Sequence, residues 1–149
     1  TFEAIGMAKV ATSAVEAREM GFLRPGDGWS MNRDHLAADA KDLAVALAAG
    51  NFVSPGLDTA IPVMGTAGIA LAEAVLFNMM EGGYISEHDR KIGIELGKII
   101  SGGVVPPNTT VTETDMLNLE RESFMRLLGE RKTLERMEHI LKTGKPLRN

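Results

Sequence analysis

The segment GGYISEHDRKIGIELGKIISGG, residues 82–103, decides how the second half of the chain folds. Ser86 and Asp89 form the S-x-x-D pattern of a capping box, in which each side chain satisfies a backbone N–H near the start of a helix. A glycine pair stands at each end of the segment and stops helices there. The segment therefore predicts a helix over residues 87–100. Its apolar residues share one side of that helix: Ile92, Leu96, Ile99 and Ile100.

Three consecutive groups at this helix start, Glu87, His88 and Asp89, can each bind a metal or transfer a proton. Successive side chains on a helix project about 100° apart, so three neighbours cannot easily converge on one ion. Acidic residues are also favoured in the first turn by the helix dipole. We interpret the triplet as a helix start, and a small catalytic or metal site remains the alternative.

Similar start and stop signals divide the rest of the chain. Ser13 with Glu16 and Thr112 with Asp115 read as further capping boxes, and Asn32 as another helix cap. These signals predict an all-α fold with six to seven helices and at most one short strand pair. The first dozen residues show helical spacing without a visible start. The other predicted helices cover residues 14–20, 33–49, 66–80, 87–100, 113–128 and 131–142.

Apolar spacing predicts which helix faces point inward. Residues 61–80 form the most apolar run, and we expect a buried helix over residues 66–80 rather than a membrane span, because Glu73 and two glycines interrupt that run. The predicted inward residues of the remaining helices are Leu36, Ala40, Leu43 and Leu47; Leu117, Phe124 and Leu128; and Leu134, Met137 and Leu141.

Composition narrows the possible classes of protein. The 149 residues suit one domain, with 44% apolar and 24% charged residues. The absence of cysteine excludes disulfides, zinc–thiolate sites and thiol chemistry, and fits a cytoplasmic protein. A net charge of −4 argues against nucleic-acid binding. Residues 121–149 are the exception, with 8 Lys/Arg against 4 Asp/Glu, a basic end that suits a phosphate-bearing ligand, an acidic neighbour or plain solvation.

No catalytic motif is visible in the sequence. The three histidines fall on three separate predicted helices, without the spacing of a metal site. Nucleophile-elbow, phosphate-loop and dinucleotide-binding patterns are also missing. From residues alone, the chain is predicted to be a helical domain with no catalytic residue and no metal ligand.

Three stretches carry a resemblance to known families. AKVATSAVEAREMGFL, residues 8–23, resembles an element of the crotonase (enoyl-CoA hydratase/isomerase) superfamily. Together with ISEHDRKIG and LNLERESFMRLLGERKTLERMEHILKTGKPLRN, it is similar to the C-terminal end of bacterial multifunctional 3-hydroxyacyl-CoA dehydrogenases of fatty-acid β-oxidation. The resemblance implies that residues 1–50 end a crotonase-like module, that 51–61 form a linker, and that 62–149 form a C-terminal helical bundle.

The resemblance also implies where the chemistry lies. In that family the oxyanion hole, the acid/base glutamates and the NAD-binding part precede the matched region, so we expect this chain to be inactive alone and to hold no cofactor. NAD and a coenzyme A thioester would serve the parent protein. The start at Thr1 is expected to be a cut within a longer polypeptide, and the end at Asn149 its natural C-terminus. The chain would complete the acyl-CoA pocket or support packing of modules or subunits.

The same family implies a ligand contact near the C-terminus. There, a basic residue of the last helix can touch coenzyme A, which makes Lys142 and Lys145 candidates for binding its phosphates. The alternative is that Lys142 complements the helix C-terminus and Lys145 is solvated. Expected partners are the rest of the polypeptide, acyl-CoA through the parent protein and further copies in a homo-oligomer, with no nucleic acid and no membrane span. A free-standing helical protein-interaction domain is the alternative function.

Overall fold

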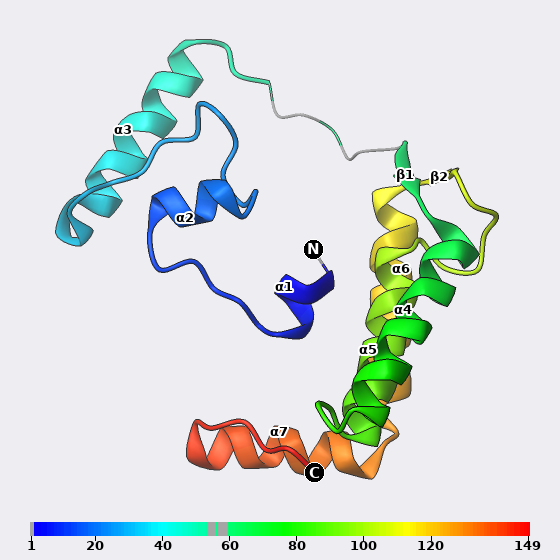
Figure 1. The fold of residues 1–149 in the computed structure, drawn as a ribbon. Coiled ribbons are helices and arrows are strands. Elements are labelled where there is room, and N and C mark those ends of the chain that lie inside the picture. The colour runs from blue at the N-terminus through cyan, green and yellow to red at the C-terminus, as the bar shows by residue number, and fades with distance from the viewer. Residues whose placement is uncertain (1, 54–55, 57–59) are drawn as a thin grey trace. The chain divides into compact units, whose positions relative to one another are not determined.

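A computed structural model describes residues 2–53, 56 and 60–149 of the chain (Figure 1). It divides into two compact units, Glu3–Gly56 and Thr1–Phe2 with Leu57–Asn149. Part of the predicted linker, residues 54–55 and 57–59, lies outside the described residues. The assignment of the first part to the end of a crotonase-like module and of the rest to a separate helical bundle stays a prediction.

In the smaller unit, local side chains cap the starts of two helical segments. Ser13 Oγ accepts a hydrogen bond from the Glu16 amide at 3.1 Å, as the sequence predicts. The Glu16 carboxylate, however, accepts from the amide and hydroxyl of Thr12 rather than from Ser13. The predicted helix over residues 33–49 begins as one 3₁₀ turn, in which Asn32 accepts from the Asp34 amide. The elements are α1 (Phe2–Gly6), α2 (Ala14–Glu19), η1 (Arg33–His35) and α3 (Leu36–Ala49).

The larger unit is a bundle with a strand pair at one end. Helices α4, α5 and α6 run alongside one another, and α7 lies across the end opposite the strands (Figure 1). Strands β1 and β2 are antiparallel, with Pro62 opposite Thr110. The prediction of an all-α fold with at most one short strand pair is confirmed for the described residues. The elements are β1 (Ile61–Val63), α4 (Gly65–Glu81), α5 (Glu87–Ile100), β2 (Thr109–Val111), α6 (Glu113–Leu128) and α7 (Arg131–Thr143).

The packing of α4 against α5 depends on glycines inside α5. A Cβ atom added to Gly97 would lie 2.8 Å from the Cβ of Ala72, and one added to Gly93 would lie 2.6 Å from a methyl of Leu76. Both distances are shorter than carbon–carbon contact, so the two helices approach more closely than larger residues would allow. Glycine weakens a helix by about 1 kcal/mol relative to alanine, and close packing offsets that cost here.

The predicted inward faces of several helices are wrong. Helix α4 was expected to be buried, yet Leu71 is 58% exposed and Phe77 is 49% exposed. Periodicity shows which residues share a face, but a layer of three helices covers only part of each helix surface. The buried hydrophobic side chains of the described residues are Val63, Leu76 and Val111. Exposed residues that were expected inside are Leu36, Ala40, Leu43, Leu47, Leu117, Phe124, Leu134, Met137 and Leu141.

Within the described residues, no helix is both long and apolar enough to cross a membrane.

Candidate functional site

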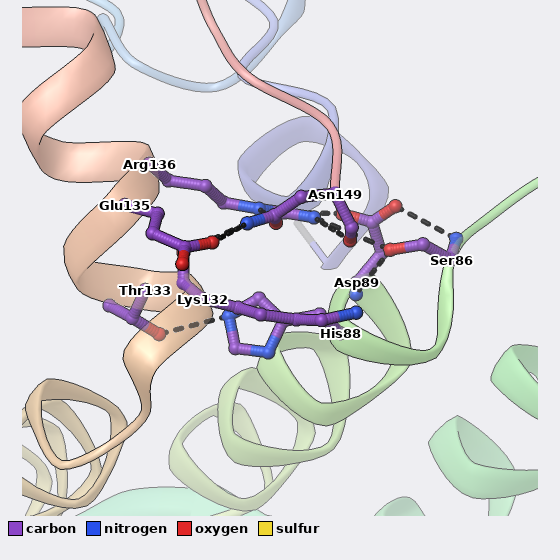
Figure 2. A network of polar contacts seen from close by, with 8 residues as sticks. All are labelled: Ser86, His88, Asp89, Lys132, Thr133, Glu135, Arg136 and Asn149. Carbon is purple, nitrogen blue, oxygen red and sulfur yellow. Dashed lines mark hydrogen bonds and ion pairs between the residues drawn. The ribbon is translucent and has the colours of Figure 1, made fainter.

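The most connected polar cluster of the larger unit joins the start of α5 to α7 (Figure 2). Its centre is Arg136, which projects from α7 toward the first turn of α5. The Arg136 guanidinium donates to Asp89 Oδ1 at 2.6 Å and to Ser86 Oγ at 3.3 Å. The capping box predicted from the sequence is present, with Ser86 and Asp89 bonding each other's amides. The capping box therefore both starts α5 and accepts the hydrogen bonds that α7 donates through Arg136.

Asn149 extends this cluster from the end of the chain. Arg136 Nε donates to Asn149 Oδ1 at 2.8 Å, and Arg136 Nη2 donates to the main-chain oxygen of Asn149 at 3.3 Å. The Asn149 amide donates in turn to Glu135 Oε2 at 3.0 Å. We call Ser86, Asp89, Glu135, Arg136 and Asn149 the Arg136 clasp. It folds the last residues back onto α7 while it fastens α7 to α5.

Electrostatics at the clasp favour the ionised form of Asp89. Partial burial raises the pKa of the Asp89 carboxyl, but hydrogen bonds from the Ser86 backbone and the Arg136 side chain outweigh burial and lower that pKa below its usual value of 3.8. Asp89 is 25% exposed and Arg136 is 18% exposed, so water screens the pair less than it screens a surface ion pair. The carboxylate and guanidinium are thus charged partners near neutral pH.

His88 lies beside the clasp and is almost completely buried, with 2% of its surface exposed. Its Nε2 is 3.0 Å from the hydroxyl of Thr133 on α7. Burial lowers the pKa of the His88 imidazole below 6.5, and the nearby Arg136 cation lowers it further. The imidazole is therefore neutral at pH 7, and it forms a second link between α5 and α7.

A shallow groove of about 320 Å³ opens next to His88. Two of its lining residues, Lys91 and Glu130, form an ion pair at 3.0 Å. The residues that line the groove carry charges of both signs, and none of them has a hydroxyl or thiol group. Its lining residues are Glu87, His88, Lys91, Glu130, Arg131 and Lys132.

The Glu87, His88 and Asp89 triplet does not converge on one point. Asp89 bonds to Ser86 and Arg136, and His88 bonds to Thr133, so these two side chains have separate partners. Among residues 2–53, 56 and 60–149, no group of three His, Cys, Asp or Glu side chains could hold a metal ion. The geometry supports the interpretation of the triplet as a helix start.

The predicted coenzyme A contacts lie at the far end of α7, away from the clasp. Lys142, in the last turn of the helix, forms an ion pair with Glu138 one turn earlier. Lys145 follows Gly144, which ends the helix in the left-handed conformation with φ of 68°. The Lys145 amide donates to Thr143 Oγ1 at 3.2 Å, and its residue is exposed. Phosphate binding by the two lysines stays a prediction.

Sequence reasoning missed the residues that complete the clasp. Arg136 is one of several basic residues in α7, and its partner Asp89 lies 47 residues earlier. Thr133 contacts His88 across 45 residues. Both pairings depend on the direction that the chain takes between α6 and α7, and the spacing of residues within either helix does not specify that direction. The acidic half of the ion pair was identified through its capping pattern, but the basic half carried no comparable signal.

Comparison with known proteins finds one curated relative that is much longer than this chain. No protein-family model matches it, and no solved structure matches it. A curated protein of Bacillus subtilis (strain 168), named Probable 3-hydroxyacyl-CoA dehydrogenase, is 48% identical to it over all 149 residues. The chain spans 19% of that protein's length. Over its whole length, the chain is thus similar to the C-terminal part of a longer protein that bears the dehydrogenase name.

Proposed function

We propose that the chain is the C-terminal part of a 3-hydroxyacyl-CoA dehydrogenase of fatty-acid β-oxidation that also contains a crotonase-like module. In this proposal its role is to hold the parts of that enzyme together and to complete the acyl-CoA pocket. The identity of 48%, which extends over the full length of the chain, supports a fold shared with the matching part of the Bacillus subtilis protein. The fraction of that protein that the chain covers, 19%, supports a role as one part of a larger polypeptide.

The observation that carries the packing role is the amount of apolar surface in the larger unit. Helix α6 exposes Phe124 and Met125, and α4 exposes Leu71 and Phe77. Soluble monomers rarely leave contiguous apolar patches larger than a few hundred Å² in water. Each Å² of apolar surface removed from water contributes about 25 cal/mol, so covering these faces would stabilise an assembled protein substantially.

Helix α7 offers the clearest docking face. The Arg136 clasp and the His88–Thr133 contact hold the helix through polar groups, which leaves its apolar residues available. We call Leu134, Met137, Ile140 and Leu141 the α7 apolar face. Leu141 is 85% exposed, and Leu134 and Leu141 lie seven residues apart, so they occupy the same side of the helix. The proposed occupant of this face is the remainder of the same polypeptide.

Catalysis in this proposal belongs to the remainder of the enzyme, which would bind NAD and the coenzyme A thioester. The proposal assigns Lys145 to the coenzyme A phosphates, because its side chain is exposed and forms no ion pair within the described residues. Lys142 would contribute less, because its ammonium group is already paired with Glu138. A homo-oligomer would bring this end of one subunit near the pocket of another.

The size of the native polypeptide tests the proposal against a free-standing interaction domain. An antibody raised against residues 131–149 should detect, in a lysate of the source cells prepared with protease inhibitors, a band several times heavier than 16.0 kDa. The coding sequence should remain open upstream of the Thr1 codon and encode a dehydrogenase there. A stable 16.0 kDa product, with a start codon at that point, would support the free-standing domain instead.

A further inference from the structure

The contact between His88 and α7 places a titratable group where its charge would be unfavourable. His88 projects from α5 into the junction with α7, and Nε2 meets Thr133 Oγ1 at 3.0 Å (Figure 2). With 2% of its surface exposed, the residue has almost no access to bulk water. A charged imidazolium at this position would lose most of its hydration, which disfavours the charged form of a buried group.

The charged neighbours of His88 make protonation still less favourable. Lys91 lies on the same helix, Lys132 and Arg136 lie on α7, and Glu130 immediately precedes α7. Glu130 raises the pKa of His88, but it already binds Lys91 at 3.0 Å, and Glu87, which lines the same groove, stands in the first turn of α5. The carboxylate of Asp89, next in sequence, is bound to Arg136. An imidazolium would therefore join three cations, Lys91, Lys132 and Arg136, and the carboxylates of Glu130 and Asp89 are already paired with two of them.

We propose that His88 is an acid-sensitive latch, in which the neutral imidazole allows α7 to dock on α5 and its protonation releases α7. The hydrogen bond to Thr133 does not itself set this dependence, because a hydroxyl can donate to a neutral imidazole or accept from a charged one. The dependence arises from burial and from the surrounding cations. Release would move α7 about the turn at Gly129 and would return His88 to water, where its proton is tolerated.

The direction of the effect follows from where the proton binds more tightly. The pKa of His88 in the docked state lies below 6.5, and release restores the ordinary value near 6.5. Below pH 6.5 the released state therefore binds more protons than the docked state, so docking weakens as the pH falls toward the docked-state pKa. Above about pH 6.5 both states are neutral and docking has its full strength. Within that window the ratio of released to docked α7 rises by up to about tenfold per pH unit.

Hydrogen exchange of the 149-residue chain, corrected for the intrinsic effect of pH on exchange, measures this ratio. Between pH 7.5 and pH 5.5, the opening constant of α7 amides should rise up to about tenfold, while amides of α6 change much less. His88→Gln, which keeps a neutral hydrogen-bonding group, should remove the acid response of α7. The matched control is His139→Gln, because His139 lies on α7 and no hydrogen bond or ion pair of the described residues joins its side chain to α5, and this variant should keep the response.

A second measurement covers the case in which His88→Gln fails to fold. NMR titration of the unsubstituted chain should give a His88 midpoint below 6.5 that coincides with shift changes in α7 amides. A His88 midpoint at or above 6.5 would overturn the latch, as would α7 shifts that follow another histidine. An acid response of equal size in the folded His88→Gln variant would overturn it too. None of these results depends on what the parent protein catalyses.

Discussion

Arg136 Nη1 lies 2.6 Å from Asp89 Oδ1, and the same Asp89 side chain accepts the Ser86 amide that starts α5. The Asp89 carboxylate thus caps α5 and also bonds to a residue of α7 that lies 47 positions later in the sequence. This arrangement couples the position of α7 to the integrity of the first turn of α5. A substitution that weakens the Arg136 clasp should therefore destabilise both the first turn of α5 and the docking of α7.

Replacing Arg136 tests how much the clasp stabilises the larger unit. Arg136→Gln should lower the free energy of unfolding by about 1.5–3 kcal/mol, the range for hydrogen bonds to charged groups, because Asp89 and Asn149 both lose their partner. Urea unfolding followed by far-UV circular dichroism measures this change.

The control for this substitution is Arg131→Gln. Arg131 lies on the same helix and pairs with Glu135, but it is 92% exposed. Exposed pairs contribute about 0–1 kcal/mol, so this variant should unfold close to the original chain. Equal losses for the two substitutions would show that the clasp has no special role.

The Asp89 carboxylate should make stability fall in acid. Hydrogen bonds from Ser86 and Arg136 outweigh burial and lower the Asp89 pKa below 3.8 in the folded chain. The unfolded chain therefore binds a proton first as the pH falls, and the stabilisation is present above about pH 3.8 and is lost through the folded pKa. In urea unfolding at several pH values, Asp89→Asn should be less stable than the original chain at pH 6. The difference should shrink as the pH approaches 3, and a constant difference would contradict the assignment.

The glycine at position 97 tests the close packing of α4 and α5. A methyl group there would meet the Cβ of Ala72 at 2.8 Å, and neither atom can rotate away. Overpacking of a core typically costs 1–3 kcal/mol, and the better helix propensity of alanine returns about 1 kcal/mol. Gly97→Ala should therefore lower stability by about 1 kcal/mol in urea unfolding. Gly28→Ala, where an added methyl meets nothing within 4 Å, should cost less, and the reverse order would contradict this packing.

The proposed phosphate contact of Lys145 can be tested in the longer dehydrogenase to which the proposal assigns the chain. Lys145→Gln should raise KM for an acyl-CoA substrate by about two- to fivefold, the effect of an exposed ion pair, and should leave kcat unchanged. The same comparison with a dephospho-CoA thioester, which lacks the 3′-phosphate, would show whether that phosphate is the group bound. Lys41→Gln, an exposed lysine on α3, is the control and should not change KM. An unchanged KM for Lys145→Gln would contradict the proposed contact between Lys145 and a coenzyme A phosphate.

Local features of this fold were predictable from the sequence. The capping boxes at Ser86 and Thr112 are present as predicted, because each depends on residues only three positions apart. Glycine pairs marked the ends of α4 and α5 for the same reason. Helix bounds in the larger unit therefore agree with prediction to within one residue.

Features that depend on distant residues were not predictable in this way. Periodicity placed Leu134 and Leu141 on one face of α7, but it could not show that the described residues leave that face open. The partners of Arg136 lie 47 residues before it and 13 residues after it, so no short pattern connects them. Lys142 and Lys145 were identified as candidates only by a family resemblance. The geometry around them does not by itself indicate a ligand.

The proposed function has this chain pack, through its exposed apolar faces, onto the rest of a larger polypeptide that is a dehydrogenase. The most direct test is to express the remaining part of the polypeptide separately and to titrate the 149-residue chain into it by calorimetry. We predict a one-to-one complex per subunit, with a negative heat-capacity change from apolar burial. Leu134→Glu combined with Leu141→Glu should weaken that complex, and Lys41→Glu should not. A folded remainder that does not bind the folded chain would contradict the claim.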